Sequence, residues 1–232
     1  YTTLFRSEAR KNGVHYTRLS AVSLVLDEVM DGLTGMESVL DLTCGSGIFL
    51  VEALRRLVHR RADGQAPTRD LIRKILHEQV YGVDISEAAI RVAAFSLYLA
   101  ALELDPDPQP PHSLKFRPLI GKTLLIGDAR TVEQDGDGRE ALTTPSGLKQ
   151  FDLIVGNPPW SFRGLKGTQA RRKTRDVGIP AQPRGEGLDF VLRAAEFSHE
   201  KTRFGVILSA MPFFSRSGTG MAAAQHVMRL LA

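Results

Sequence analysis

The sequence predicts an α/β fold built on a doubly wound, mostly parallel sheet. Short apolar runs of strand length alternate with longer segments whose apolar residues recur every three or four positions. Strands separated by helices in this way are parallel, and right-handed crossovers place the helices on the faces of the sheet. With 232 residues, 43% of them hydrophobic, the chain is long enough for one such domain with a sizeable core.

The first half of the chain is expected to supply two strands and four helices. The strands are short apolar runs that cover residues 38–43 and 80–85. The helices show helical apolar spacing and cover residues 19–33, 48–61, 66–79 and 87–104. Thr17 and Ser86 precede two of these helices, and a hydroxyl there can accept a hydrogen bond from a free backbone N–H, so both are expected to be caps.

The second half is expected to add three strands and two helices. The strands cover residues 122–129, 151–159 and 203–210, and the helices cover residues 188–201 and the chain from about residue 220 onward. A proline-rich loop is expected at residues 105–111. Residues 133–147 show no core pattern and are expected to be a surface connection.

Several whole-chain features narrow the function. The single cysteine, Cys44, excludes an internal disulfide and favours a reducing, cytoplasmic location. No apolar run reaches the ~18–20 residues that cross a bilayer and no signal-peptide pattern opens the chain, so no membrane partner is expected. The six histidines show no metal-ligand spacing, so no metal is expected. The chain begins at Tyr1 and stops within a helical pattern, which suggests a piece of a longer protein.

The first motif, VLDLTCGSGIFLVEA, joins the first strand to the helix that follows it. Asp41 ends the strand, and Gly45 and Gly47 carry no Cβ, so the backbone can approach a ligand closely. The start of the helix offers unpaired N–H groups that suit a carboxylate or a phosphate, at the edge of the sheet where open sheets bind ligands. The pattern is neither G-x-G-x-x-G nor a phosphate loop, and an ordinary tight turn is the alternative interpretation.

Two further strands also end in an acid. Asp84 can accept two hydrogen bonds from a ribose diol, or it can cap the next helix, a role that Ser86 fills better. Asp128 can accept a hydrogen bond from an adenine amino group. The acids and the glycine turn together describe a pocket for adenosine with an amino-acid-like tail, which is the anatomy of S-adenosylmethionine.

The second motif, DLIVGNPPW, ends the fourth expected strand. Pro158 and Pro159 lack N–H groups and have a fixed φ, so they stiffen the backbone and leave nearby carbonyls free to accept. The Asn157 side-chain oxygen and the Pro158 carbonyl are two acceptors that suit the two hydrogens of an NH₂ group. Trp160 offers a flat face on which a planar group can stack. The alternative is a proline turn with a core tryptophan.

DLTCGSGIFL and DLIVGNPPW together resemble the class I S-adenosylmethionine-dependent methyltransferases that act on planar NH₂ groups. The resemblance is closest to the N6-adenine DNA methyltransferases of restriction–modification and phage-defence systems. Members with the gamma arrangement place a Tyr-Thr helix just before the glycine motif, as GVHYTRLSAVSLVLDEV does here. The resemblance runs from about Gly13 to the final helix and implies a Rossmann-like methyltransferase sheet that lacks its last strands.

The resemblance also implies the site residues. The cofactor-binding residues are Tyr16, Thr17, Asp41, Thr43, Cys44, Gly45, Gly47, Asp84, Ile85, Asp128, Ala129 and Asn157. The catalytic residues, which hold the target amine, are Asn157, Pro158, Pro159 and Trp160. The chain departs from the family pattern at Leu42-Thr43, where many relatives have Pro-Ala, and at Arg18, where relatives often have Pro. Trp160 replaces the usual Tyr or Phe and keeps a stacking surface.

By the same resemblance, residues 1–37 form an N-terminal helical segment that packs on the cofactor site. Residues 38–232 form the catalytic domain of a longer protein, without a target-recognition domain. The expected substrate is double-stranded DNA, and a target-recognition domain or a specificity subunit is expected outside this chain.

A basic stretch follows Trp160. Between Arg163 and Glu186 lie seven Lys or Arg and two acids, whereas the whole chain has a net charge of only +4. The stretch is expected to hold DNA phosphates beside the pocket. Its predicted nucleic-acid-binding residues are Arg163, Lys166, Arg171, Arg172, Lys173 and Arg175. A solvated loop is the alternative.

Two other functions remain open at this point. Asn-Pro-Pro-aromatic motifs also serve methyltransferases that act on a protein glutamine or on guanine N2 of ribosomal RNA, although the Tyr-Thr helix favours DNA. The chain can also be a non-catalytic, cofactor-binding fragment of a larger defence protein, since no target-recognition domain follows the last helix.

Overall fold

The computed structural model describes residues 17–108, 116–134, 136–159 and 188–208. The chain divides into two compact units. One consists of Thr17–Gly156 and Glu196–Val206 and contains the sheet. In the other, the structure describes residues 157–159, the helix α8 (Leu188–Ala195) and residues 207–208. Tyr16, Trp160, the predicted nucleic-acid-binding residues 163–175 and the helix expected from residue 220 lie outside the described residues.

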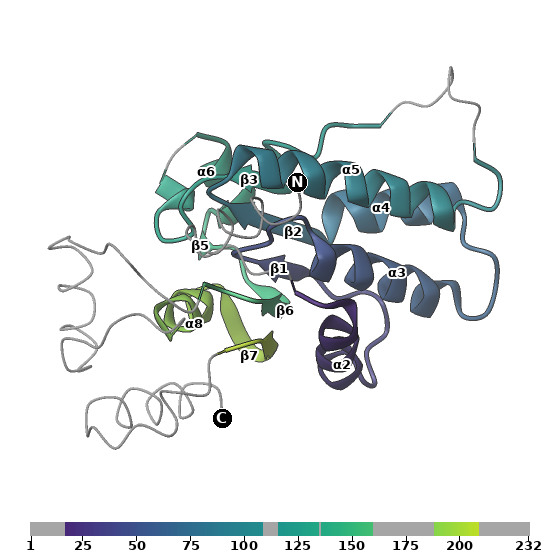
Figure 1. The fold of residues 1–232 in the computed structure, drawn as a ribbon, viewed down its shortest axis with the longest axis horizontal. Helices are drawn as coiled ribbons and strands as arrows, with labels where there is room; N and C mark the ends of the chain where they lie inside the picture. The colour runs from purple at the N-terminus through teal and green to yellow at the C-terminus, as the bar shows by residue number, and fades with distance from the viewer. Residues whose placement is uncertain (1–16, 109–115, 135, 160–187, 209–232) are drawn as a thin grey trace, which may run out of the picture. The chain divides into compact units, whose positions relative to one another are not determined.

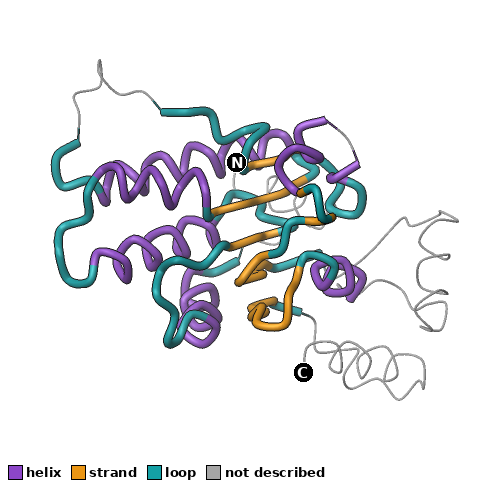
Figure 2. The backbone as a smooth tube through the Cα atoms, turned by 180° about the vertical axis from the view of Figure 1, so that it is seen from behind, coloured by secondary structure: helices purple, strands orange, loops and turns teal. Residues whose placement is uncertain are grey.

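Five parallel strands form the central sheet in the order β3-β2-β1-β6-β7 (Figures 1 and 2). Their bounds are β1 Val39–Asp41, β2 Val80–Asp84, β3 Leu124–Ile126, β6 Phe151–Gly156 and β7 Ser198–Val206. The chain first builds outward from β1 through β2 to β3 and then returns to add β6 on the other side of β1. The order therefore reverses between β1 and β6, which is the point where open α/β sheets bind ligands.

Four helices of this unit pack next to one another along the sheet (Figure 1). They are α2 Leu19–Val29, α3 Ile48–Ala62, α4 Arg69–Glu78 and α5 Glu87–Leu104. Leu50, Leu54 and Leu57 on α3 are fully buried, as are Val39 and Leu40 on β1, so the core lies between this layer and the sheet. The parallel sheet with flanking helices confirms the predicted fold class.

The first helix is held by the last strand of the sheet. A Cβ on Gly205 of β7 would lie 2.7 Å from Cγ1 of Val25, so only glycine lets the strand approach α2 this closely. Arg203 donates from Nη1 to the carbonyls of Val29 (3.2 Å) and Asp31 (2.5 Å), which have no helical partner at the end of α2. These contacts place α2 in the same unit as the sheet, and the boundary expected at residue 37 stays a prediction.

The helix starts predicted from the sequence agree best with the structure where a side chain caps the helix. Ser86 accepts a hydrogen bond from the Ala89 N–H (3.3 Å), and α5 covers the predicted residues. Thr68 caps α4 in the same way. The prediction that Thr17 caps α2 is wrong: Arg18 occupies the cap position and its side chain makes no capping bond.

Residues 133–147, expected to be a surface connection without a core pattern, are mostly exposed, but they contain secondary structure and bury Leu142. They include most of η2 (Val132–Gln134), α6 (Gly136–Leu142) and a hairpin of β4 (Thr143–Thr144) and β5 (Gly147–Leu148). The prediction of one helix over residues 188–201 is wrong in its second half. The helix expected over 188–201 ends at Ala195, and β7 begins at Ser198. Phe197 is buried against Phe151, and its carbonyl accepts the Phe151 N–H, which favours the strand over the helix.

Within the described parts of the chain, no helix is both long and apolar enough to cross a membrane. The same residues contain no cluster of three His, Cys, Asp or Glu side chains that could hold a metal ion.

Candidate functional site

The candidate site lies at the carboxyl edge of the sheet, where β1, β2 and β6 end in Asp41, Asp84 and Gly156. The register pairs Asp41 with Gly82 and Asp84 with Ile126, so Asp128 lies just beyond the end of β3 at the same edge. The three acids predicted from the sequence therefore share one edge of one sheet, at the ends of three neighbouring strands.

Asp41 is the most buried of these acids, with only 1% of its surface exposed. Its Oδ1 accepts a hydrogen bond from the Thr43 N–H at 2.9 Å. Burial raises the pKa of Asp41 to about 7; the Thr43 hydrogen bond opposes the rise and the negative charge of Asp84 adds to it. The carboxyl group therefore keeps its proton to a higher pH than a solvent-exposed aspartate does.

Gly156 makes the position of Asp41 possible. A Cβ on Gly156 would lie 2.7 Å from Oδ1 of Asp41, and its φ of 151° is one that side chains rarely adopt. Gly156 is also the last residue before Asn157. The end of the first strand and the start of the Asn-Pro-Pro segment are thus joined by one close contact that only glycine allows. The sequence analysis missed this residue, and only the spatial approach of β1 and β6 shows its role.

The glycine turn uses its two glycines differently. Gly45 and Gly47 have left-handed φ values of 53° and 82°. A Cβ on Gly47 would lie 2.9 Å from the Cβ of Ala93, so this glycine lets α3 approach α5. A Cβ on Gly45 would meet nothing within 4 Å among the described residues, so Gly45 borders open space. Close packing explains Gly47, whereas Gly45 leaves room for a ligand.

The start of α3 has no side-chain cap. Its cap residue is Gly47, and its first turn contains no acid. The α4 and α5 helices, by contrast, are capped by hydroxyls and carry Asp70 and Glu87 in their first turns. The first N–H groups of α3 and its positive dipole end are therefore suited to a ligand carboxylate.

Asp84 joins the glycine turn to α5. Its Oδ2 accepts the Gly45 N–H at 2.9 Å and its Oδ1 accepts the Ser86 N–H at 2.8 Å. Each carboxylate oxygen has a further acceptor position, so the predicted hydrogen bonds to a ribose diol remain possible. Next to it, Ile85 exposes 74% of its surface and can pack against a planar ring.

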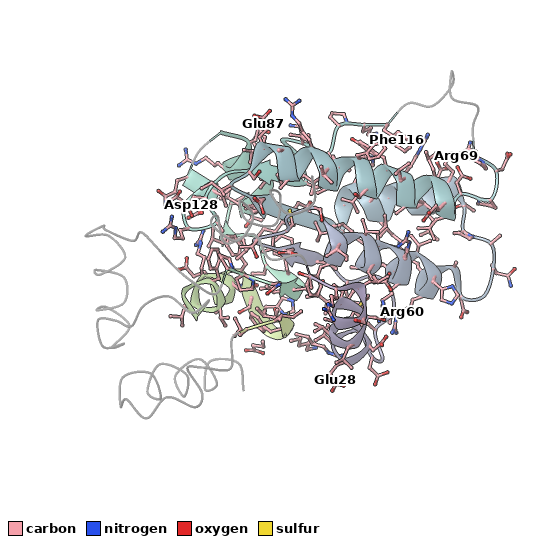
Figure 3. All side chains as sticks on the ribbon, viewed as in Figure 1. Glu28, Arg60, Arg69, Glu87, Phe116 and Asp128 are labelled. Atoms are coloured by element: carbon pink, nitrogen blue, oxygen red, sulfur yellow. The ribbon has the colours of Figure 1, made fainter. Side chains whose placement is uncertain are left out.

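Asp128 has a partner that the sequence analysis missed. Its Oδ1 accepts hydrogen bonds from the backbone N–H (3.0 Å) and Nε (2.7 Å) of Arg130, and its Oδ2 contacts the same guanidinium. Figure 3 shows Asp128 on the side of the sheet where the strands end. The ion pair orients the Asp128 carboxylate. An adenine amino group that binds there would share this carboxylate with Arg130.

Cys44 and Ala129, two further predicted residues, are buried at 4% and 5% exposure. Burial raises the pKa of the Cys44 thiol well above its usual range, and the charges of Asp41 and Asp84 add to this. The thiol fills space next to Gly82, where a Cβ would lie 3.0 Å from Sγ. This environment fits a packing residue and not a nucleophile.

The Asn-Pro-Pro segment follows β6 directly. Pro158 is buried, whereas Asn157 and Pro159 are partly exposed. These residues belong to the second unit, so their approach to the acids stays a prediction. The predicted roles of Tyr16, Trp160 and the basic residues concern parts of the chain outside the described residues.

The strand order, the acids that end the first two strands and the glycine turn between them define an α/β protein of the methyltransferase type. The chain belongs to the N-6 DNA Methylase family, whose model matches residues 2–228. This confirms the resemblance to N6-adenine DNA methyltransferases of the restriction–modification type.

Among curated proteins, the chain is 27% identical over 145 residues to the adenine-specific methyltransferase PglX of Streptomyces coelicolor, covering 53% of this chain and 12% of that protein. It is 26% identical over 183 residues to the methylase subunit of the type I restriction enzyme MjaIX of Methanocaldococcus jannaschii, covering 77% and 25%. The chain therefore spans a quarter or less of these relatives.

Two solved structures share the fold. The nuclease-deletion mutant of the type ISP restriction–modification enzyme LlaGI, in complex with a DNA substrate mimic, has a TM-score of 0.66 at 16% identity, over 89% of this chain and 19% of that one. The M protein of the type I restriction enzyme EcoKI has a TM-score of 0.59 at 19% identity, over 92% and 38%.

The contact between Asp41 and Gly156 predicts a large effect of Gly156→Ala. The added methyl group meets a buried carboxylate and takes an unfavourable φ, so we expect the free energy of unfolding to fall by about 3 kcal/mol. Gly64→Ala is the matched control, because Gly64 also has a positive φ but faces open space. For the control we expect the free energy of unfolding to fall by about 1 kcal/mol. Urea denaturation measures both values, and an equal decrease in the two variants would show that the contact with Asp41 is unimportant.

The raised pKa of Asp41 predicts a pH-dependent stability. Between about pH 4 and pH 7 the folded protein keeps a proton on Asp41 that the unfolded chain has lost, so this group lowers stability as pH rises. The slope amounts to about 1.4 kcal/mol per pH unit within this window. Asp41→Asn should remove this contribution, which urea denaturation at several pH values can measure. Parallel pH profiles of the two proteins would contradict the assignment.

Proposed function

We propose that this chain is the catalytic part of an enzyme that transfers a methyl group from S-adenosylmethionine to the N6 amino group of adenine in DNA. The observation that carries the proposal is the contact of Asp41 with Gly156. It brings the end of the cofactor strand against the residue from which Asn157-Pro158-Pro159 continues. The family match and the names of the curated relatives support DNA adenine as the substrate over a protein glutamine or ribosomal RNA.

The residues at the carboxyl edge fit the cofactor. The open space at Gly45 and the uncapped start of α3 suit its carboxylate, and the remaining acceptor positions of Asp84 suit its ribose. Ile85, Asp128 and Ala129 would border the adenine. The charge of Asp84, which also acts on Asp41, gives the edge a negative potential that suits the positive amine and sulfonium of the ligand.

When bound, S-adenosylmethionine supplies an electrophilic methyl group on a sulfonium. The protein's task is to present the amine. The Asn157 side-chain oxygen and the Pro158 carbonyl would accept the two N6 hydrogens, which favours a more tetrahedral nitrogen and makes its lone pair available. Trp160 would stack on the adenine ring. A methyl–nitrogen bond forms as the methyl–sulfur bond breaks, and the extra proton leaves to water.

Placement and fixed dipoles are sufficient for this reaction. No covalent enzyme intermediate is needed, and the buried Cys44 thiol with its raised pKa is unsuited to form one. In duplex DNA the target base must first leave the stack, at a cost of a few kcal/mol. We infer that the basic residues 163–175 hold phosphates while it does so, and that sequence recognition resides in a domain or subunit outside this chain.

The roles of Asn157 can be separated by the variant Asn157→Ala. We expect methyl transfer to DNA to fall about 100- to 1000-fold, because one acceptor for the developing charge is lost, while cofactor affinity stays within about twofold. Transfer is measured with labelled cofactor and nucleoside mass spectrometry for N6-methyladenine, and affinity by calorimetry. Gln65→Ala removes an exposed amide and should change neither. Equal loss of transfer and cofactor binding would indicate a structural role for Asn157.

The basic stretch can be tested by replacing Arg171, Arg172 and Lys173 with Gln. Each lost phosphate contact should reduce the slope of log affinity against log salt by about 0.9, and duplex binding should weaken at low salt. The matched control removes three exposed charges elsewhere, Arg91, Lys122 and Arg139. Fluorescence anisotropy over a salt series measures the slope. A slope that is the same in both variants would exclude the stretch from the DNA interface.

A further inference from the structure

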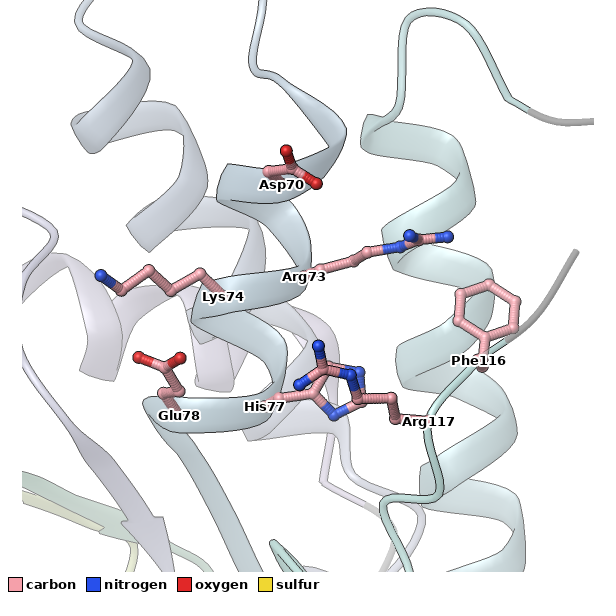
Figure 4. Close-up of a pocket in the computed structure, with 7 residues that line it drawn as sticks. All are labelled: Asp70, Arg73, Lys74, His77, Glu78, Phe116 and Arg117. Carbon is pink, nitrogen blue, oxygen red and sulfur yellow. The ribbon is translucent and has the colours of Figure 1, made fainter.

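A second cavity lies away from the carboxyl edge. It has a volume of about 350 Å³ and lies between α4 and the segment after α5 that contains Phe116 and Arg117 (Figure 4). The last residues of α4, His77 and Glu78, are separated from the start of β2 by one residue, so the cavity is on the amino side of the sheet. Figure 3 shows Phe116 toward the end of α5 that is farther from Asp128. None of the predicted cofactor-binding residues lines this cavity.

The cavity holds three cations that form no ion pair within the described structure. Arg73, Lys74 and Arg117 line it, and in the described structure no carboxylate lies within 4.0 Å of their charged nitrogens. Other arginines of the same helical layer are paired: Arg55 with Glu103, Arg56 with Asp27, Arg69 with Asp105 and Arg91 with Glu87. Asp70 and Glu78 also line the cavity but form no ion pair with these cations. A pocket with unpaired guanidinium groups suits an anion, and above all a phosphate.

The pKa of His77 also reflects the positive charge in the cavity. Burial lowers the pKa of His77, and the charges of Arg117 and Arg73 lower it further, opposed by Glu78. The two arginines come from different elements, one from α4 and one from the segment after α5, and both act on the same imidazole. Their positive fields therefore overlap inside the cavity, where one bound anion would interact with both.

The wall of the cavity that carries Phe116 is held in place. The Phe116 ring packs on Tyr98 of α5 with the ring centroids 4.6 Å apart. The Tyr98 hydroxyl donates to the Arg117 carbonyl (2.9 Å) and accepts the Leu119 N–H (3.1 Å). These bonds fix the backbone from Arg117 to Leu119, so the segment that carries Phe116 and Arg117 is held in place before any ligand arrives.

We propose that this cavity binds a nucleotide, with its phosphate between Arg73 and Arg117 and its base plane against Phe116. Unpaired guanidinium groups recognise phosphate oxygens, an aromatic ring stacks on a base, and the volume is within the range of small-molecule sites. The nucleotide is either free or one unit of a nucleic-acid strand. This site is separate from the proposed cofactor and adenine sites and does not depend on them.

The test is calorimetry on the full-length protein with thymidine monophosphate, with a short oligothymidylate and with inorganic phosphate. We expect the double variant R73Q/R117Q to weaken binding about tenfold or more, since at least one charge-assisted bond is lost. Arg91→Gln, which removes an exposed charge that is paired with Glu87, should have no effect. Phe116→Ala should weaken binding of the mononucleotide but not of inorganic phosphate.

The two ligands identify the source of the nucleotide. Loss of affinity for thymidine monophosphate in R73Q/R117Q supports a free nucleotide, and loss for the oligothymidylate alone supports a unit of a strand. Unchanged affinity for both ligands overturns the proposal. A thermal melt that matches the wild type excludes misfolding of the double variant, and R73K/R117K, which keeps the charges, should recover part of the affinity.

His77 gives an independent readout. A phosphate beside it should raise its pKa, so binding should take up protons, as calorimetry in buffers of different ionisation enthalpy measures. His77→Gln should remove this uptake, while ionisation of the phosphate itself contributes equally to both proteins. Equal proton uptake by both would contradict the placement of the phosphate.

Discussion

The candidate site depends on one close contact, the buried Asp41 carboxyl group against the bare backbone of Gly156. It joins the ends of β1 and β6, between which the order of the sheet reverses. Burying an acid is costly, and the rise of its pKa to about 7 reflects that cost. Asp41 lies where the glycine turn and the Asn-Pro-Pro segment begin. A buried acid that lowers stability at such a position is typical of a ligand-binding site.

A second carboxylate makes this edge rigid. Asp84 binds the N–H groups of Gly45 and Ser86, so one side chain fixes both the turn after β1 and the start of α5. It also contributes to the raised pKa values of Asp41 and Cys44. The negative charge of Asp84 disfavours ionisation of Asp41, and a cationic ligand such as the proposed cofactor would relieve this repulsion.

The sequence predicted the parts that local rules determine. Helix α5 follows from the Ser86 cap, and the acids could be placed because each ends an apolar run of a parallel sheet. It failed where tertiary contacts override local signals: Phe197 and Phe151 pack together and turn an expected helix into β7. Gly156 and Arg130 were missed for a related reason. The role of Gly156 appears only when β1 and β6 adjoin, and an Asp-x-Arg pattern gives no sign of an ion pair by itself.

The two edges of the sheet have opposite electrostatic character. The carboxyl edge concentrates buried or partly buried acids, whereas the cavity on the amino side holds arginines that lack an ion pair within the described structure. Along α3 and α5, by contrast, surface arginines form ion pairs with neighbouring glutamates. Charges left unpaired around a concave, aromatic-walled pocket are less stable without a ligand than with one. Because the cavity shares no lining residue with the predicted cofactor site, a cation-bearing cofactor and an anionic nucleotide can bind the same domain without competing for space.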